Sequence, residues 1–438
     1  MKLAGRSNMA QAPPTNKPEI PMKPIRYLGL VLLVLTTALP ALADRVRDDD
    51  KKNNADGFAP MFNGRDLTGW VNVNCAPGTF YVKNNEIITT GKPTGYLRTQ
   101  KQYENFIAEF EWMHIPPSPG AVGNSGFFVW ADPLPAVGSP YTRGIEVQVL
   151  VNLEYKNKKG QVTATSQGDL FSIWGARCVP DRPHPDGWER CLPSENRARG
   201  AGEWNHYRVE AKDGVIKLHV NGKVVSGLSK CRPRKGYLAL ESEGSECHFR
   251  NLRIKELPSS DPAQEEIANQ AQGHQNLFTG LDLAGWKADA DANKHWQPRD
   301  YVLHYDGKGK ELRTEKEYAD AEFIADFRIS AQKGKTLQPC KLKFRDQVFL
   351  EVPLTKDHSL SFIQPTGVEQ RLKRVKDLKA NGQWNRLQVT LKGTAFRVAL
   401  NGEAAGEIEM RGAAPKGFLA LVPSEEMDFA NLFVRELP

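Results

Sequence analysis

This 438-residue chain has little excess of positive over negative charge, no clustered metal ligands and little helical periodicity. The formal net charge is +7, but residues 1–43 hold five basic residues and one acid, and without them 54 basic residues face 51 acidic ones. A balance so close to neutral gives no support for nucleic-acid binding. No Cys-x-x-Cys pair or Cys/His cluster occurs, which argues against a structural zinc site.

Long hydrophobic runs are also lacking, apart from one near the N-terminus. Residues 27–39 form an apolar run of about 13 residues, which is too short for a membrane span. Basic residues precede the run and Ala41-Leu42-Ala43 follows it, in the pattern of a secretory signal peptide. We therefore predict a signal region over 1–43, with the signal peptide at about 22–43, and a periplasmic or extracellular protein without stable membrane insertion after cleavage.

Cysteine is sparse, with six residues, all of them after the signal region. An exported chain can keep disulfides. Cys178 is expected to pair with Cys191, and Cys231 with Cys247, although the connectivity of six cysteines cannot be read from their spacing.

The ends of the first half of the chain return in the second half. The segment 62–70 (FNGRDLTGW) returns at 278–286 (FTGLDLAGW), and 202–205 (GEWN) returns at 382–385 (GQWN). The segment 106–110 (FIAEF) also returns, at 323–327 (FIADF), so position 112 matches 329 just as 204 matches 384. Between these positions the first copy has 91 residues and the second has 54. The 37 residues present once mark where a site is expected, because function is grafted onto folds locally.

This repeat divides the chain into domains. We predict a first domain over 57–258 and a second, shortened domain over 276–438. A flexible leader at 44–56 precedes them, and a hydrophilic linker at 259–275 joins them.

Alternation of apolar and polar residues predicts strands throughout both copies. Residues 207–211 and 216–220 alternate, and Asn221-Gly222 then forms a two-residue turn that is typical of a hairpin. Asn401-Gly402 repeats this turn in the second copy. Many short strands joined by turns indicate an all-β fold. The series resembles concanavalin A-like and laminin-G-like jelly rolls, so we predict two such sandwiches in tandem.

The segment that occurs once carries the candidate site. In the predicted strand 143–150, Ile145 and Val147 point one way, and Glu146 and Gln148 point the other way. Glu146 and Gln148 are therefore either a solvated face paired with Arg143 or part of a polar concave surface.

The aromatic residues of this segment have two interpretations. Trp130 and Trp174 are either core residues or a stacking platform for a sugar ring, because carbohydrate sites pair aromatic faces with polar side chains that bind hydroxyls. His184, which lies between prolines, is expected to be an exposed loop residue.

A second carboxylate is missing from the candidate strand. Retaining glycosidases need two carboxyl groups about 5 Å apart, and Glu146-Val147-Gln148 offers one. Direct hydrolysis of an ordinary glycoside is therefore poorly supported.

Six short motifs occur in order along the first copy: FNGRDLTGW (62–70), GNSG (123–126), EVQ (146–148), GEWN (202–205), VNG (220–222) and FRNL (249–252). Their order and spacing resemble the bacterial 3-keto-disaccharide hydrolase family, also named 3-keto-glucoside 1,2-lyase/3-keto-2-hydroxy-glucal hydratase. The resemblance covers nearly all of the first copy and only the ends of the second.

The resemblance implies a sandwich that acts on sugars already oxidised at C3, with one well-placed base. Glu146 would be the base or a metal ligand, and a divalent cation on Glu146 and Asp169 is an option that the sequence does not establish. With Glu146, Gln148 is the other implied catalytic residue. The implied substrate-binding residues are Asn124, Ser125, Trp130, Arg143, Asp169 and Trp174.

Two positions depart from the family pattern. Leu150 is followed by Val151 where relatives often carry Asp, and the segment 167–171 lacks a histidine that many relatives have nearby. Two functions therefore stay open. The first is an exported enzyme that eliminates, hydrates or hydrolyses 3-keto-glycosides, and the second is a non-catalytic carbohydrate-binding or cell-surface protein.

Overall fold

The fold was obtained as a computed structural model. It describes residues 56–156, 158–164, 167–329, 339–352, 359–373, 375, 378–379 and 382–438. The predicted signal region and most of the leader lie outside these residues. No helix within the described ranges is both long and apolar enough to cross a membrane.

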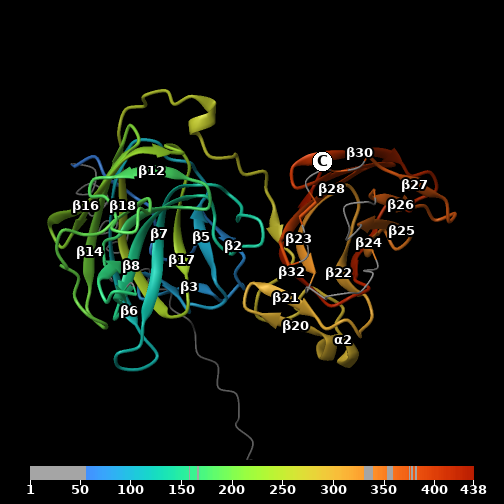
Figure 1. The fold of residues 1–438 in the computed structure, drawn as a ribbon, viewed down its shortest axis with the longest axis horizontal. Coiled ribbons are helices and arrows are strands. Elements are labelled where there is room, and N and C mark those ends of the chain that lie inside the picture. Colours follow the sequence, from blue (N-terminus) through green and yellow to red (C-terminus); the bar gives the residue numbers. More distant parts are fainter. Residues whose placement is uncertain are drawn as a thin grey trace, which may run out of the picture. The chain divides into compact units, whose positions relative to one another are not determined.

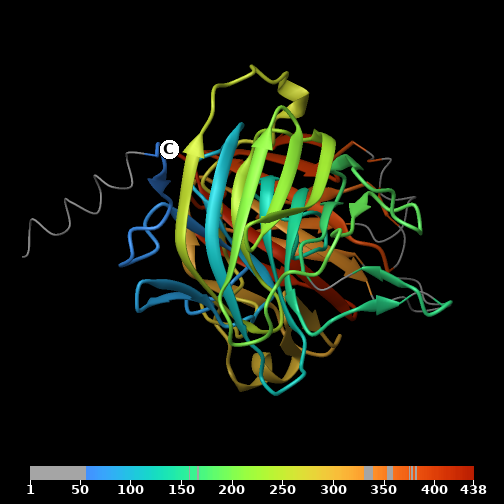
Figure 2. The ribbon, with the colours of Figure 1, turned by 90° about the vertical axis from the view of Figure 1, so that its left-hand side faces the viewer.

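The first sandwich consists of two antiparallel sheets whose buried faces enclose one core (Figures 1 and 2). One sheet has the strand order β12 (Arg177–Pro180), β16 (Lys223–Arg232), β15 (Val215–Val220), β14 (Asn205–Lys212), β6 (Phe106–Ile115), β18 (Glu246–Glu256), β4 (Glu86–Thr89) and β3 (Phe80–Lys83), with β1 (Ala59–Pro60) on β18. The other has the order β13 (Arg190–Cys191), β11 (Leu170–Ile173), β8 (Gly144–Val151), β7 (Gly123–Ala131), β17 (Tyr237–Ser242), β5 (Gly95–Thr99) and β2 (Trp70–Val73). A short hairpin, β9 (Tyr155–Lys156) and β10 (Val162–Ala164), stands apart from both sheets.

The second sandwich repeats this plan, so the predicted all-β tandem fold is confirmed. Its first sheet has the order β20 (Trp296–Arg299), β21 (Val302–Tyr305), β32 (Met427–Glu436), β23 (Ala321–Ile329), β28 (Asn385–Lys392), β29 (Ala395–Leu400) and β30 (Glu403–Glu409), with β19 (Gln275–Asn276) on β32. Its other sheet has the order β22 (Leu312–Tyr318), β31 (Gly417–Val422), β24 (Cys340–Phe344), β25 (Val348–Val352), β26 (Ser361–Ile363) and β27 (Glu369–Arg371). The short helices are η1 (Gln264–Glu266) and α2 (Ala290–His295).

The 37 residues that occur only in the first copy were expected to carry the site, and the strand order corrects this expectation. In the second copy, β24, β25 and β26 occupy the places that β7, β8 and β11 hold in the first copy. The difference in length therefore does not remove the strands that carry the candidate site. In the described residues it corresponds to longer loops, the β9–β10 hairpin and the edge strand β12.

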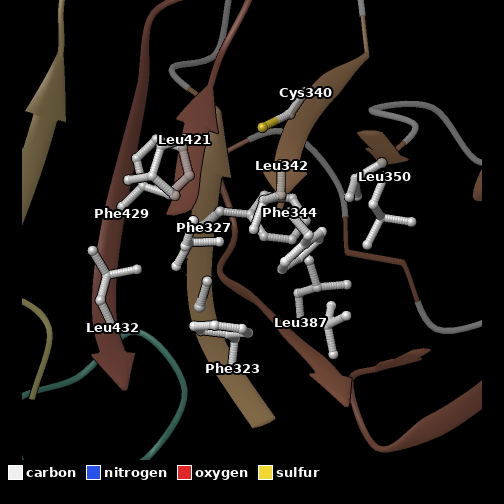
Figure 3. Close-up of a cluster of buried hydrophobic side chains, with 14 of the residues drawn as sticks. Phe323, Phe327, Cys340, Leu342, Phe344, Leu350, Leu387, Leu421, Phe429 and Leu432 are labelled. Carbon is white, nitrogen blue, oxygen red and sulfur yellow. The ribbon is translucent and has the colours of Figure 1, made fainter. Parts of the chain in front are cut away.

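Alternation in the sequence becomes alternation in burial. Strands β14 and β28 show the same pattern, in which every second residue is buried from Asn205 and from Asn385 onward. Side chains from facing strands meet in the core of the second sandwich, as Figure 3 shows for Phe323, Phe344 and Leu421 among others. The Asn221-Gly222 and Asn401-Gly402 turns have positive φ at both residues, as their hairpins require.

The predicted disulfides are wrong, because all six cysteines are free and buried. Cys231 lies on β16 and Cys247 on β18, and three strands separate these two in the sheet. At about 4.8 Å per strand the separation is far beyond the reach of a disulfide. Cys178 and Cys191 each direct their thiol to a backbone carbonyl, of Glu189 and Leu192 respectively.

Candidate functional site

Three carboxyl groups converge on one face of the first sandwich, at the centre of the sheet formed by β8, β7 and β17. Glu146 belongs to β8, Glu241 to β17, and Glu243 lies just after β17, where it is bridged to Asn124 on β7. The alternation of these strands directs the side chains of Glu146, Gln148 and Glu241 to the same face. The sheet thus brings together acids that are almost one hundred residues apart in the sequence.

Gly126 on β7 makes room for two of these acids. A side-chain carbon at this glycine would lie 2.9 Å from Glu241 Oε2 and 3.0 Å from Glu146 Oε1. The two carboxyl groups are therefore immediate neighbours across a position that bears no side chain.

A hydrogen-bonded chain positions the third acid. The hydroxyl of Tyr141 donates to Glu243 Oε1 at 2.6 Å, and the Asn124 amide donates to Glu243 Oε2. Gln148 Nε2 in turn donates to Asn124 Oδ1 at 2.7 Å. Asn124 and Gln148, both predicted site residues, thus act on Glu243, which the sequence analysis did not identify.

The three acids of this cluster all have raised pKa values. Glu241 is fully buried, and neither of its carboxyl oxygens has a hydrogen-bond partner among the described residues. Burial, followed by the charge of Glu243, raises the pKa of Glu241 and that of Glu146 well above the usual range for a carboxyl. Burial also raises the pKa of Glu243, against the effect of its hydrogen bond from Tyr141.

The guanidinium group of Arg190 supplies a positive charge in the same cavity wall as Glu146 and Glu243. Arg190 Nε and Nη2 both donate to Asp169 Oδ2, at 2.8 and 2.5 Å, and the guanidinium stacks 4.1 Å from the centre of the Phe171 ring. Its charge opposes the rise in the pKa of Glu146.

The cation suggested for Glu146 and Asp169 does not fit this arrangement. The buried carboxylate of Asp169 is already neutralised by Arg190. Within the described residues, no group of three or more His, Cys, Asp or Glu side chains could hold a metal ion.

These groups line a cavity of about 360 Å³. Glu146, Glu243 and Arg190 form part of its wall, together with the indoles of Trp174 and Trp188. Both indoles are 51% exposed, so their faces are available to a ligand. A cavity wall that combines acids with exposed aromatic rings has the composition of a sugar site.

The remaining predicted residues lie elsewhere. Trp130 is fully buried, and its indole donates to the carbonyl of Glu104, so it is a core residue and not a platform. Ser125 is also buried and donates to the backbone of Glu241 at 2.8 Å, which places it beneath the site. Arg143 forms a two-pronged ion pair with Asp132 at 2.8 and 3.0 Å, outside the carboxyl cavity.

Several site residues were missed from the sequence. Glu241 and Glu243 belong to an alternating Leu-Glu-Ser-Glu run, 240–243, that could have identified them as a second polar face. Trp188 was not among the predicted site residues, and His184, four residues before it, was expected to be exposed. That expectation is wrong, because His184 is buried and stacks on Trp188 at 4.5 Å between ring centres.

The prediction of a single carboxylate holds for strand β8 but not for the cavity. Acids from β8 and from the end of β17 share it, so the number of carboxyl groups no longer argues against the hydrolysis of an ordinary glycoside.

Comparison with known proteins identifies the family. The family described as "3-keto-alpha-glucoside-1,2-lyase-like domain" matches residues 57–255 and again 273–435. The chain belongs to this family. Both copies are therefore members, and the family indicates a carbohydrate-active protein. No curated protein matches the chain.

Three solved structures that are similar to this chain each cover less than half of it. A candidate glycosyl hydrolase from Parabacteroides distasonis is 23% identical, covers 48% of this chain and 97% of its own, and has a TM-score of 0.37. The carbohydrate-binding module CBM66 from Bacillus subtilis is 15% identical, covers 35% and 96%, and has a TM-score of 0.28. The galectin LEC-6 from Caenorhabditis elegans is 10% identical, covers 32% and 94%, and has a TM-score of 0.23.

Proposed function

We propose that the first sandwich eliminates the C1 substituent from 3-keto-glycosides and then hydrates the resulting glucal. The observation that carries this proposal is Glu146, a carboxyl group that lines the cavity beside Arg190 and makes no hydrogen bond to another described side chain. An acid with a raised pKa and no fixed side-chain partner is suited to take a proton from the substrate and to return it.

The reaction requires a proton to leave C2 and a substituent to leave C1. The ketone at C3 acidifies the C2 proton, so Glu146 removes it and the electron pair forms an enolate. When the enolate collapses, the C1–O bond breaks, a C1=C2 double bond forms and the leaving oxygen takes up a proton. Water then adds its oxygen to C1 and a proton to C2, which gives the free 3-keto sugar.

The other cavity residues have roles in the same scheme. The cation Arg190 stabilises the enolate oxygen, an effect typically worth about 10²–10³ in rate. Glu243, which reaches the cavity and has a raised pKa, donates the proton that the leaving group takes up. Trp174 and Trp188 stack on the sugar ring.

A second candidate function is sugar binding without turnover. It is favoured by the two half-exposed indoles, which would serve a lectin equally well. The carboxyl cluster favours the enzyme, because burying three neighbouring acids costs stability that binding alone does not require.

The deciding experiment incubates the purified protein with a 4-nitrophenyl 3-keto-glucoside in D₂O and follows the products by mass spectrometry. We expect release of the nitrophenol and one deuterium at C2 of the sugar product. The unoxidised glucoside is the control and should remain intact, because its C2 proton is not acidic. Sugar binding without release of nitrophenol would instead establish the lectin function.

We also infer that the protein acts outside the cytoplasm, on the strength of the apolar run at 27–39 and the small residues at 41–43. N-terminal sequencing of protein recovered from the native host or a bacterial expression host tests this. A mature chain that begins at Asp44 is expected, and a chain that retains residues 22–43 would contradict it.

A further inference from the structure

A second, larger cleft lies next to the carboxyl cavity. It has a volume of about 660 Å³, and Trp174 belongs to the wall of both. Its walls come from the first sandwich, from the linker and from the second sandwich, and include Arg98, Asp132, His274, Trp384 and Gln388.

The walls of this cleft are held together by a buried polar network. Asp326 on β23 is fully buried, accepts from Arg386 at 2.7 and 2.8 Å, and accepts from the backbone N–H of Gly138 at 2.7 Å. Asn431 donates to the same carboxylate and to the carbonyls of Ala136 and Ser139. The 136–139 loop of the first sandwich is thus fixed to strands of the second, within one compact unit.

One cation in the cleft wall has no anion. The side chain of Arg98 is 5% exposed and lies over the Tyr237 ring, and its hydrogen bonds go to the carbonyls of Pro133 and Thr99. Among the described residues no carboxylate pairs with it. The other two arginines of the wall differ, since Arg143 is paired with Asp132 and Arg386 with Asp326.

A buried guanidinium without a counter-ion is costly unless a ligand supplies one. Carboxylates fit the planar fork of arginine especially well. Trp174 lines both this cleft and the carboxyl cavity, so the two cavities adjoin at this indole. A ligand that fills both cavities would therefore carry its negative charge in the cleft, outside the carboxyl cavity that holds the reacting ring.

From these observations we propose that the cleft binds a carboxylate-bearing sugar unit, of the hexuronate class, with Arg98 as the residue that selects the charge. The carboxylate pairs with Arg98 and the ring packs beside Trp174. The assignment of this unit to the substrate rests on the proposed function. The binding of the unit by the cleft does not depend on the proposed function.

The test is calorimetric titration of the intact protein with glucuronate, with glucose and with sulfate as separate probes. We expect glucuronate to bind at least ten-fold more tightly than either of the other two. Arg98→Gln should reduce the glucuronate affinity at least ten-fold, whereas Arg65→Gln, a change at an exposed arginine in the first sandwich, should not change it. Glu146→Gln should also leave it unchanged, which separates this proposal from that for the carboxyl cavity.

A second variant guards against a folding defect in Arg98→Gln. Gln388 lies on β28 of the second sandwich, lines the same cleft and is partly exposed, so Gln388→Trp fills the cleft without replacing the guanidinium. It should weaken glucuronate binding as strongly. Equal binding of glucuronate and glucose, tight binding of sulfate alone, or unchanged affinity in both folded variants would overturn the proposal.

Discussion

In both sandwiches three neighbouring strands pair in the same order, so their residues can be matched position by position. Leu240, Phe127 and Val147 stand side by side in the first sandwich. Leu421, Leu342 and Leu350 stand side by side at the same place in the second. The residues of the carboxyl site therefore have defined counterparts: Phe349 for Glu146, Glu351 for Gln148, Lys341 for Gly126 and Val422 for Glu241.

These counterparts show how one fold can keep or lose such a site. In the first sandwich a glycine leaves space for two acids, whereas in the second Lys341 occupies that space and pairs with Glu351 at 2.6 Å. Apolar Phe349 and Val422 replace the two acids. The second sandwich therefore has no uncompensated acid cluster to bury at this place, and we interpret it as the support that supplies a wall of the neighbouring cleft.

The largest effect is expected from making the first site resemble the second. Gly126→Lys would place a side chain between Glu241 and Glu146, as Lys341 does in the second sandwich. We expect at least a 100-fold loss of kcat/KM for a 3-keto-glucoside, because the base would be paired and displaced. The reverse change, Lys341→Gly, should leave activity unchanged, and a similar loss from both changes would break the comparison.

A smaller effect is expected from the aromatic wall. Trp188→Ala removes a half-exposed indole and should raise KM about ten-fold with little change in kcat, since stacking contributes about 0.5–1.5 kcal/mol beyond buried area. Steady-state kinetics measure this. Trp204→Ala, at an indole that faces the other sheet near Arg250, is the control and should leave KM as it is.

Loss of the tyrosine hydroxyl should have a still smaller effect. Tyr141→Phe removes the 2.6 Å hydrogen bond to Glu243, and we expect about a five-fold loss of kcat, the value of one ordinary hydrogen bond. The pH profile of kcat should also shift upward, because the lost donor favoured the charged form of Glu243. Tyr301→Phe in the second sandwich should change neither quantity.

The smallest effect concerns stability. Glu241 has a raised pKa in the fold, so its proton is held more tightly than in the unfolded chain. Its contribution to stability is fully present below the unfolded value of about 4.3 and is lost as the pH rises through the folded pKa. Glu241→Gln should therefore raise Tm by about 2–4 °C at pH 8, and by nothing near pH 4. Thermal unfolding at both pH values measures this, with the exposed Glu256→Gln as control; a lower Tm at pH 8 would contradict it.

The sequence was sufficient for the fold because strand alternation and Asn-Gly turns act locally. It also led to the prediction of Glu146, Gln148 and Asn124 as site residues, and the structure places these three together in the wall of one cavity. It could not identify Glu241, Glu243 or Tyr141 as partners, because only the pairing of β17 with β7 brings them there. Trp130 was misassigned for the same reason, since burial depends on which strands stack above it.

The central claim is that the carboxyl cavity of the first sandwich performs the chemistry and the matched position of the second does not. It is tested most directly by measuring aglycone release from a 3-keto-glucoside with Glu146→Gln and with Glu351→Gln, after confirming that both are folded. We predict a loss of at least 100-fold for Glu146→Gln, the range for one acid–base group, and wild-type activity for Glu351→Gln. Undiminished release with Glu146→Gln, or equal loss in both variants, would contradict the claim.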